Sequence, residues 1–194
     1  MASHRIELRD ATKRDAAALA ALNVASWRAA YAHMLPEAFL ASLDVAAWEQ
    51  RLRARFADAA QFTVVACAGR CRLGFVTAGP IRDEPPVQGG EIYALYVDPA
   101  HDGQGVGSAL LEAAVTRLGG SGFSQASLWV FTRNTNARRF YEQRGWLLEP
   151  RRWYWQRDGL RRQLVCYTKP LGACSGRFPF RAIGPEPSRG SLIR

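Results

Sequence analysis

The sequence predicts a single α/β domain, and two observations carry this prediction. A strand, a glycine-rich turn and a helix follow one another between Glu91 and Leu118. Short alternating segments that are typical of antiparallel hairpins stand on both sides of this unit. At 194 residues the chain is long enough for one domain with a substantial core. We therefore expect a sheet that contains the central strand, with helices packed against it.

The central strand is predicted from Glu91 to Val97, and both of its faces are rich in apolar residues. Strict alternation places four residues on one face, namely Glu91, Tyr93, Leu95 and Val97. It places three on the other face, namely Ile92, Ala94 and Tyr96. A strand that is apolar on both sides is typical of the middle of a sheet.

Glycines at positions 103, 105 and 107 form the turn after this strand. The apolar residues from Leu111 to Leu118 then repeat with helical spacing, so the helix begins in the glycine turn. Its unpaired amides and positive dipole end favour a phosphate group there. A plain connecting turn has the same pattern and stays an alternative. A Walker loop requires a lysine, and a dinucleotide fingerprint has another glycine spacing.

The net charge of +9 comes almost entirely from arginine, because Lys13 and Lys169 are the only lysines. Nine arginines lie between Arg133 and Arg162, against three acidic residues. Such a field attracts an anionic cofactor, and nucleic acid is the weaker alternative.

Other compositional features narrow the class of protein. The apolar runs are shorter than the ~20 residues that span a bilayer, and the N-terminus has no signal segment, so we expect a cytoplasmic protein without a membrane partner. The four cysteines are scattered, at positions 67, 71, 166 and 174. They favour reduced structural thiols over a disulfide or metal site.

The N-terminal elements follow from local signals. Residues 5–9 alternate as a short strand. Thr12 and Asp15 form an acidic variant of the capping box and open a helix that extends toward Tyr31. Pro36 suits the first turn of a second helix, and Asp44 the cap of a third that reaches residue 56.

Two hairpins and one further helix complete the prediction. Residues 61–67 and 73–78 pair around a glycine turn, and 147–156 with 160–168 around another. A surface loop at 83–90, a strand at 126–130 and a helix of about three turns that ends at Gly145 lie between them. Prolines and glycines from Gly172 onward predict a disordered tail over 172–194.

Two motifs resemble the GNAT acyltransferase family. The run from Asp102 to Gly107 is similar to that family's Gln/Arg-x-x-Gly-x-Gly/Ala loop and departs at its first position, Asp102. The run from Asn134 to Trp146 is similar to Asn-x-x-Ala-x-x-Phe-Tyr-x-x-x-Gly-Phe. The resemblance covers residues 5–171. It implies a mixed, mostly antiparallel sheet of about seven strands, with helices on both faces and a splayed central strand pair.

The resemblance also implies acetyl-CoA as co-substrate, without a metal. Backbone amides of the loop would hold its pyrophosphate, and main-chain groups of the central strand its pantetheine arm. The cofactor-binding residues expected on this basis are Leu95, Val97, Gly103, Gln104, Gly105, Val106, Gly107, Ser108, Asn134 and Asn136. The carboxylate of Asp102 opposes the anion, so we expect Arg138 or Arg139 to compensate, or the affinity to be lower.

Two residues are expected to be catalytic. Tyr141 matches the family's tyrosine that protonates the leaving thiolate, and a core aromatic is the alternative reading. Glu91 matches the glutamate base of the histone-type branch and would act through a water; a solvent-facing carboxylate is its alternative. His33 and His101 are the histidines of the domain, and His101 is interpreted as a surface residue of the loop.

The acceptor is expected to be a primary amine that attacks acetyl-CoA directly in a ternary complex. Trp27 and Tyr31 share a helix face and, with Tyr93, would line its pocket; ordinary core packing is the alternative. Aromatic faces favour a small cationic amine over a protein terminus or lysine. A non-catalytic acyl-CoA sensor is a further alternative, and homodimerisation stays open.

Overall fold

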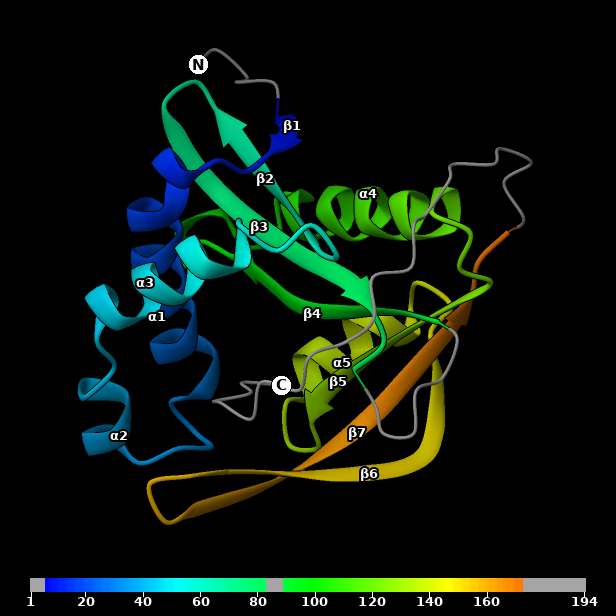
Figure 1. Ribbon diagram of the computed structural model, residues 1–194. Coiled ribbons are helices and arrows are strands. Elements are labelled where there is room, and N and C mark those ends of the chain that lie inside the picture. Colours follow the sequence, from blue (N-terminus) through cyan, green and yellow to red (C-terminus); the bar gives the residue numbers. More distant parts are fainter. Residues whose placement is uncertain (1–5, 83–88, 173–194) are drawn as a thin grey trace.

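A computed structural model describes residues 6–82 and 89–172 and shows a seven-stranded sheet with helices on both faces (Figure 1). The strand order is β1-β2-β3-β4-β5-β7-β6. All neighbouring strands are antiparallel except β4 and β5. The predicted mixed, mostly antiparallel sheet is therefore confirmed. The loop predicted at 83–90 and the tail predicted at 172–194 fall almost entirely outside the described residues.

The elements follow the predicted order. The strands are β1 (Glu7–Asp10), β2 (Phe62–Ala68), β3 (Cys71–Pro80), β4 (Gly90–Val97), β5 (Gln125–Phe131), β6 (Leu147–Arg157) and β7 (Leu160–Pro170). The helices are α1 (Ala16–Tyr31), α2 (Glu37–Ala41), α3 (Val45–Arg55), α4 (Val106–Gly120) and α5 (Thr135–Glu142), with 3-10 turns at Lys13–Asp15 and Pro99–His101. Helix α5 has eight residues and is shorter than predicted. The chain turns between its end and Gly145, whose φ is +75°.

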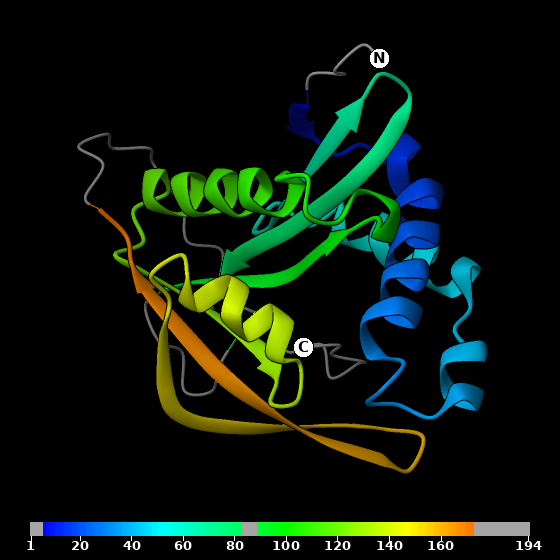
Figure 2. The same cartoon turned by 180° about the vertical axis from the view of Figure 1, so that it is seen from behind.

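The sheet separates two layers of helices, and each layer has its own hydrophobic core. Helices α1, α2 and α3 pack on one face, and α4 and α5 lie on the other, as the view from behind shows (Figure 2). Trp27 and Phe131 belong to the first core, and Leu110 and Tyr141 to the second. Both faces of β4 are therefore covered, as expected for a central strand.

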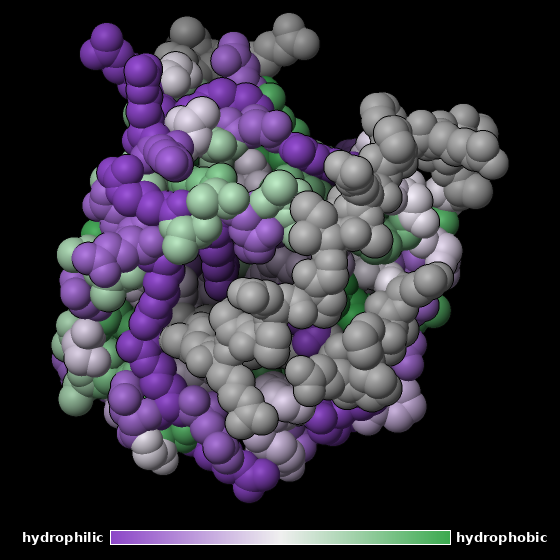
Figure 3. Space-filling model, viewed as in Figure 1, coloured by the Kyte–Doolittle hydropathy of each residue, from purple (hydrophilic) through white to green (hydrophobic). Residues whose placement is uncertain are grey.

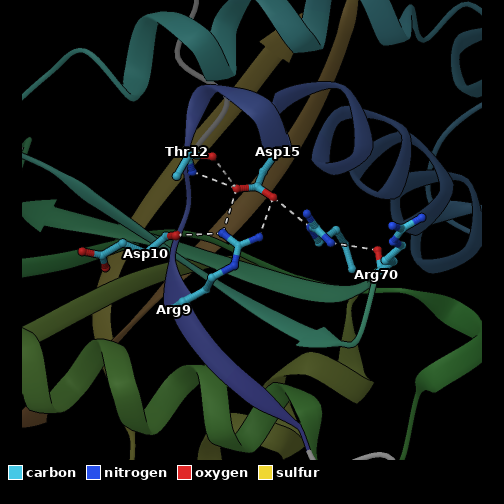
Figure 4. Close-up of polar contacts among 6 residues, drawn as sticks. Arg9, Asp10, Thr12, Asp15 and Arg70 are labelled. Atoms are coloured by element: carbon cyan, nitrogen blue, oxygen red, sulfur yellow. Dashed lines mark hydrogen bonds and ion pairs between the residues drawn. The ribbon is translucent and has the colours of Figure 1, made fainter.

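The start of α1 is held by a buried carboxylate (Figure 4). The Thr12 backbone amide donates to Asp15 Oδ2 at 2.8 Å, which is part of the predicted capping box. Arg9 donates two hydrogen bonds of 2.8 Å to Asp15, and Arg72 Nε donates a third from β3. Arg9 holds the pKa of Asp15 far below its usual range. Asp15 thus ties β1, β3 and α1 together.

Replacing Asp15 with asparagine is expected to lower the free energy of unfolding by about 2–3 kcal/mol at pH 7. The loss is moderate because Arg9 and Arg72 stay partly hydrated. Since the folded pKa is depressed, the contribution of Asp15 is complete above the unfolded value of ~3.9 and decreases as pH falls below it. Urea unfolding at pH 7 and pH 3 measures both effects.

Asp10→Asn is the matched control, because Asp10 pairs with Arg117 on the surface. We expect only a small change for this exposed pair. The role given to Asp15 would be contradicted if the two variants lost the same free energy of unfolding. It would also be contradicted if the difference between their free energies of unfolding were the same at pH 7 and pH 3.

Candidate active site

Strands β4 and β5 separate part-way along their length. They pair in parallel register only through Gly90–Ala126, Glu91–Ser127 and Ile92–Leu128. Beyond this point β4 continues to Val97, while β5 stays paired with β7 as far as Phe131. Within the described chain, the backbone of β4 after Ile92 has no strand beside it on the β5 side. The predicted splay of the central strands is confirmed.

A cavity of about 720 Å³ occupies the gap. Its walls come from both layers of helices, because the opening passes through the sheet. The α1 side contributes Ser26, Trp27, Ala30 and Tyr31, and the α4–α5 side contributes Gly103, Gly105, Gly107, Ser108, Asn134, Asn136, Phe140, Tyr141 and Arg144. Residues of β4, including Tyr93, Leu95, Tyr96 and Val97, lie between them. The volume is that of a site for a small molecule.

A β-bulge in β4 changes the faces that alternation predicts. Thr77 pairs with Ala94 and Ala78 with Ile92, so Tyr93 is an extra residue on β4. Leu95 and Val97 therefore pack on the α4 face together with Ile92, whereas Ala94 and Tyr96 pack on the α1 face. The prediction that Glu91 shares a face with Leu95 and Val97 is wrong, because the bulge shifts the alternation by one residue.

The glycine loop leaves its backbone open at the start of α4. Gly103 and Gly105 have φ values of +73° and +84°, and a Cβ added at either would meet no atom within 4 Å. Because the Ala109 amide donates to Gly105 O at 3.1 Å, the amides of residues 106–108 come before the first intrahelical bond. These three amides are therefore donors without intrahelical partners at the positive end of the helix, which is the arrangement that favours an anion.

Two predicted loop residues do not line the cavity with their side chains. Val106 is buried in the core behind the loop, and its amide alone is at the helix end. The Gln104 side chain donates to Ala100 O at 3.3 Å. Any cofactor contact of these two residues is therefore through the backbone, and their roles stay predictions.

The arginine that lies beside the glycine loop is not one of the two that the sequence predicted. Asp102 Oδ1 accepts from the Gly103 amide at 2.9 Å and so occupies one loop donor. Arg144 lines the cavity and donates to Ser108 Oγ at 2.5 Å, while its guanidinium stacks 3.9 Å above the Phe140 ring. Sequence reasoning missed Arg144. It proposed Arg138 or Arg139 instead, but neither lines the cavity, and Arg138 binds Tyr167 Oη and Thr132 O.

Helix α5 brings its predicted residues to the opposite wall. Asn134 caps the helix, since its Oδ1 accepts from the Ala137 amide at 3.1 Å, and both Asn134 and Asn136 line the cavity. Tyr141 follows two turns later and also reaches the cavity. Burial raises the pKa of the Tyr141 phenol, so it stays protonated at neutral pH.

Three phenols and an indole meet where the two walls approach each other. Trp27 Nε1 donates to Tyr96 Oη at 2.8 Å, and the hydroxyls of Tyr31 and Tyr96 interact. Burial raises the pKa of Tyr31, Tyr96 and Tyr141, and Tyr96 lies close enough to influence the other two. The functional position of Tyr96 was not predicted, because alternation assigned it only to packing.

Glu91 lies apart from the cavity lining, with a side chain 2% exposed. Its carboxylate accepts three hydrogen bonds from Arg82, from the amide, Nε and Nη2 atoms. Tyr93 lines the cavity, and its hydroxyl donates to Pro80 O at 2.5 Å. The Arg82 guanidinium covers the Tyr93 ring at 3.8 Å. The predicted base is thus already paired with a cation.

His33 and His101 both line the cavity. In the described parts of the chain, no group of three or more His, Cys, Asp or Glu side chains is arranged to hold a metal ion. The described cysteines, Cys67, Cys71 and Cys166, are free thiols. None of the helices described here is both long and apolar enough to span a membrane.

This combination of a splayed sheet and a glycine loop at a helix start defines an acyltransferase-type domain. The model of the acetyltransferase (GNAT) family matches residues 24–146, which is more than half of the chain. The uncharacterized N-acetyltransferase YuaI of Bacillus subtilis (strain 168) is 33% identical over 129 residues, 66% of this chain and 73% of that protein. The chain therefore belongs to the GNAT acetyltransferase family.

Solved structures share the fold at lower identity. The PaiA N-acetyltransferase of Thermoplasma acidophilum, in complex with coenzyme A, has a TM-score of 0.70 and 21% identity, covering 86% of this chain and 99% of that one. YncA of Salmonella typhimurium, a putative acetyltransferase with its cofactor acetyl-CoA, has a TM-score of 0.65 and 19% identity, with 88% and 96% covered. Both are similar to this chain in fold.

Proposed function

We propose that this protein transfers the acetyl group of acetyl-CoA to a small-molecule primary amine by direct attack in a ternary complex. The observation that carries the proposal is the cavity through the sheet, with an open glycine loop on one side and the α1 wall on the other. A thioester entering from the loop side and an amine from the α1 side would meet beside β4. The coenzyme A and acetyl-CoA complexes of proteins with the same fold support this cofactor.

The cofactor is assigned to the α4–α5 side of the gap. Amides of residues 103–108 hold the pyrophosphate at the positive end of α4, and Arg144 adds a full positive charge. The pantetheine arm lies along β4, where the backbone of Leu95 and Val97 has no strand beside it on the β5 side. Asn134 and Asn136 contact the arm from the α5 wall.

The chemistry follows from the groups beside β4. The neutral amine attacks the thioester carbonyl, and the Leu95 amide stabilises the oxyanion that forms. Collapse of this intermediate breaks the carbon–sulfur bond, and Tyr141 donates its proton to the thiolate. A base accepts the proton lost by the amine and returns one to Tyr141 through solvent. Glu91 stays our assignment for the base, and Arg82 must move before its carboxylate can accept a proton.

Trp27 and Tyr31 form the wall that the amine passes on the α1 side. A cavity of about 720 Å³ suits a small molecule better than a protein chain. The direct test is an amine panel in which free thiol release from acetyl-CoA is measured. Release that depends on a small amine supports the proposal. Turnover with peptide N-termini or lysines alone would assign a protein substrate, and tight binding of acetyl-CoA without turnover on any amine would indicate a sensor.

Asp102→Arg is expected to lower the Michaelis constant for acetyl-CoA. The substitution removes a carboxylate that occupies the Gly103 amide and adds a cation beside the loop. We expect roughly a tenfold effect, equivalent to one charge-assisted hydrogen bond. Steady-state kinetics at low salt measure it, with Asp98→Asn as a control that leaves the loop amides unchanged. An unchanged or higher Michaelis constant would contradict the assignment of the pyrophosphate to this loop.

A further inference from the structure

The hydroxyl of Tyr96 is held in one place on the α1 side of the cavity. Tyr96 lies on β4 between Leu95 and Val97, but its ring packs on the opposite face of the sheet, against the α1 core. Trp27 Nε1 donates to its Oη at 2.8 Å, and the ring packs against Phe75 with centroids 5.7 Å apart. Both Trp27 and Tyr96 line the cavity. The phenol therefore has a fixed position on the side assigned to the amine.

The indole that holds this hydroxyl is itself fixed by packing. Trp27 is 1% exposed, and its ring centroid lies 4.7 Å from that of Tyr31. Its neighbour Ser26 donates to Val97 O at 2.8 Å, so two adjacent α1 residues bind two adjacent β4 residues. In Figure 3 hydrophilic side chains gather over the outer surface on the α1–α3 side, whereas Trp27 is packed inside. The phenol hydroxyl is thus positioned before any ligand enters.

The direction of the Tyr96 proton follows from the chemistry of its partner. An indole N–H only donates, so the Tyr96 oxygen accepts from Trp27 and its own O–H points elsewhere. The Tyr31 hydroxyl interacts with that of Tyr96, so the indole and the two phenols bring three donor hydrogens together. Two of the three are used within this group. One phenol O–H is therefore left over, whichever way the two hydroxyls are turned.

This remaining O–H has no acceptor in the part of the chain that the structure describes. The hydroxyl of Tyr93, by comparison, donates to Pro80 O. Among residues 6–82 and 89–172, no carbonyl or carboxylate accepts a hydrogen bond from Tyr31 or Tyr96. Both phenols line the cavity, so a ligand in the cavity supplies the acceptor.

The chemistry of attack indicates which atom of the ligand accepts this O–H. The thioester is assigned to the free edge of β4 and the amine to the α1 face, which is the face of Tyr96. The attacking nitrogen is not the acceptor, because its lone pair forms the new bond to the carbonyl carbon. An oxygen of the amine substrate is left. It lies close to the amine, because Tyr96 directly follows Leu95, whose amide is assigned to the oxyanion.

We propose that Tyr96 binds the acceptor substrate through an oxygen on the carbon next to the amine-bearing carbon, so that the substrate is an amino alcohol or an α-amino carbonyl compound. This role of Tyr96 rests on the proposed acetyl transfer and names the substrate class for the same cavity. The O–H of Tyr96 fixes the substrate, and the nitrogen keeps its lone pair free for attack.

Two matched pairs of amines test this role: ethanolamine against propylamine, and glycinamide against isobutylamine. The second member of each pair has carbon in place of the oxygen. The kcat/KM values are compared per concentration of neutral amine, because the oxygen-bearing amines are weaker bases. We expect a roughly five- to tenfold preference for an oxygen-bearing member, the effect of one hydrogen bond between uncharged groups. The pair with the larger preference tells a hydroxyl from a carbonyl.

Tyr96→Phe is expected to remove the preference by raising KM for the oxygen-bearing amine, while KM for acetyl-CoA stays unchanged. Tyr167→Phe is the control, because Tyr167 is also buried but lies outside the cavity lining, where it accepts from Arg138 and donates to Glu142. The control is expected to lower the Tm and to keep the preference of the wild type. This comparison separates the loss of a buried hydroxyl from the loss of a substrate contact.

Equal kcat/KM within both pairs, or equal effects of Tyr96→Phe and Tyr167→Phe on the preference, would overturn the role of Tyr96. An equal loss of turnover on both members of a pair would also overturn it, because the O–H would then serve the thioester. If acetyl-CoA binds but no amine is acetylated, the proposed function fails instead. Melting with coenzyme A bound then decides: ethanolamine or glycinamide must raise the Tm of the wild type but not of Tyr96→Phe, and no such difference overturns the role.

Discussion

Replacing Tyr141 with phenylalanine is expected to lower kcat for acetyl transfer by roughly 10²–10⁴-fold, the usual contribution of a general acid. The phenol reaches the cavity opposite β4, and burial raises its pKa, so it holds a proton throughout the neutral range. Loss of the hydroxyl leaves the thiolate to depart without a proton. The KM for acetyl-CoA should change little, because the ring stays in the core. Free thiol release under saturating amine measures the effect.

Tyr154→Phe is the control for this variant. Tyr154 is exposed on β6, where its hydroxyl accepts from Gln163, and it does not line the cavity. We expect its kcat to equal that of the wild type. Since the pKa of Tyr141 is raised, kcat should also show no decrease from loss of this proton below about pH 10. A Tyr141→Phe enzyme with full activity would remove Tyr141 from the mechanism.

Gly105→Val is expected to weaken acetyl-CoA binding by roughly 100-fold or more. Gly105 has a φ of +84°, where a β-branched residue is strained, and the space beside its Cα is open. A valine side chain would fill the position assigned to the pyrophosphate and turn the neighbouring amides away. Losing one or two charge-assisted hydrogen bonds of about 1.5–3 kcal/mol each gives this magnitude. Titration calorimetry with acetyl-CoA measures the dissociation constant.

A matched glycine separates backbone strain from loss of the binding site. Gly159, in the β6–β7 turn, has a φ of +74° and open space around its Cα, but it lies outside the cavity lining. Gly159→Val should therefore lose similar stability and bind acetyl-CoA normally. If both variants bound the cofactor equally well, the glycine loop would not be its anchor.

The parts of the site that the sequence predicted are those set by neighbouring residues. The glycine turn that opens α4 and the helix that carries Tyr141 were both predicted. The structure adds the left-handed backbone of Gly103 and Gly105 and the cap that Asn134 makes at the start of α5. The turn and the helix depend on spacing within one segment, so the order of residue types is enough to predict them. The hairpins and the capping box of Thr12 and Asp15 were predictable for the same reason.

The parts that were missed depend on pairing between distant segments. The bulge at Tyr93 exists only in the register between β4 and β3, and it changes the faces of Leu95 and Val97. Arg144 meets Ser108 across 36 positions, and Tyr96 meets Trp27 across 69. No local pattern marks such contacts. The contact between the Arg82 guanidinium and the Tyr93 ring likewise depends on the pairing of β3 with β4.

Hydrogen–deuterium exchange with and without acetyl-CoA tests the central claim most directly. The claim is that the thioester lies between β4 and β5, with its phosphates on the loop before α4. We expect acetyl-CoA to slow exchange of the amides in residues 93–97 and 103–108, which have no strand or helix partner on that side. Protection confined to other segments, or no change at a saturating acetyl-CoA concentration, would contradict the account.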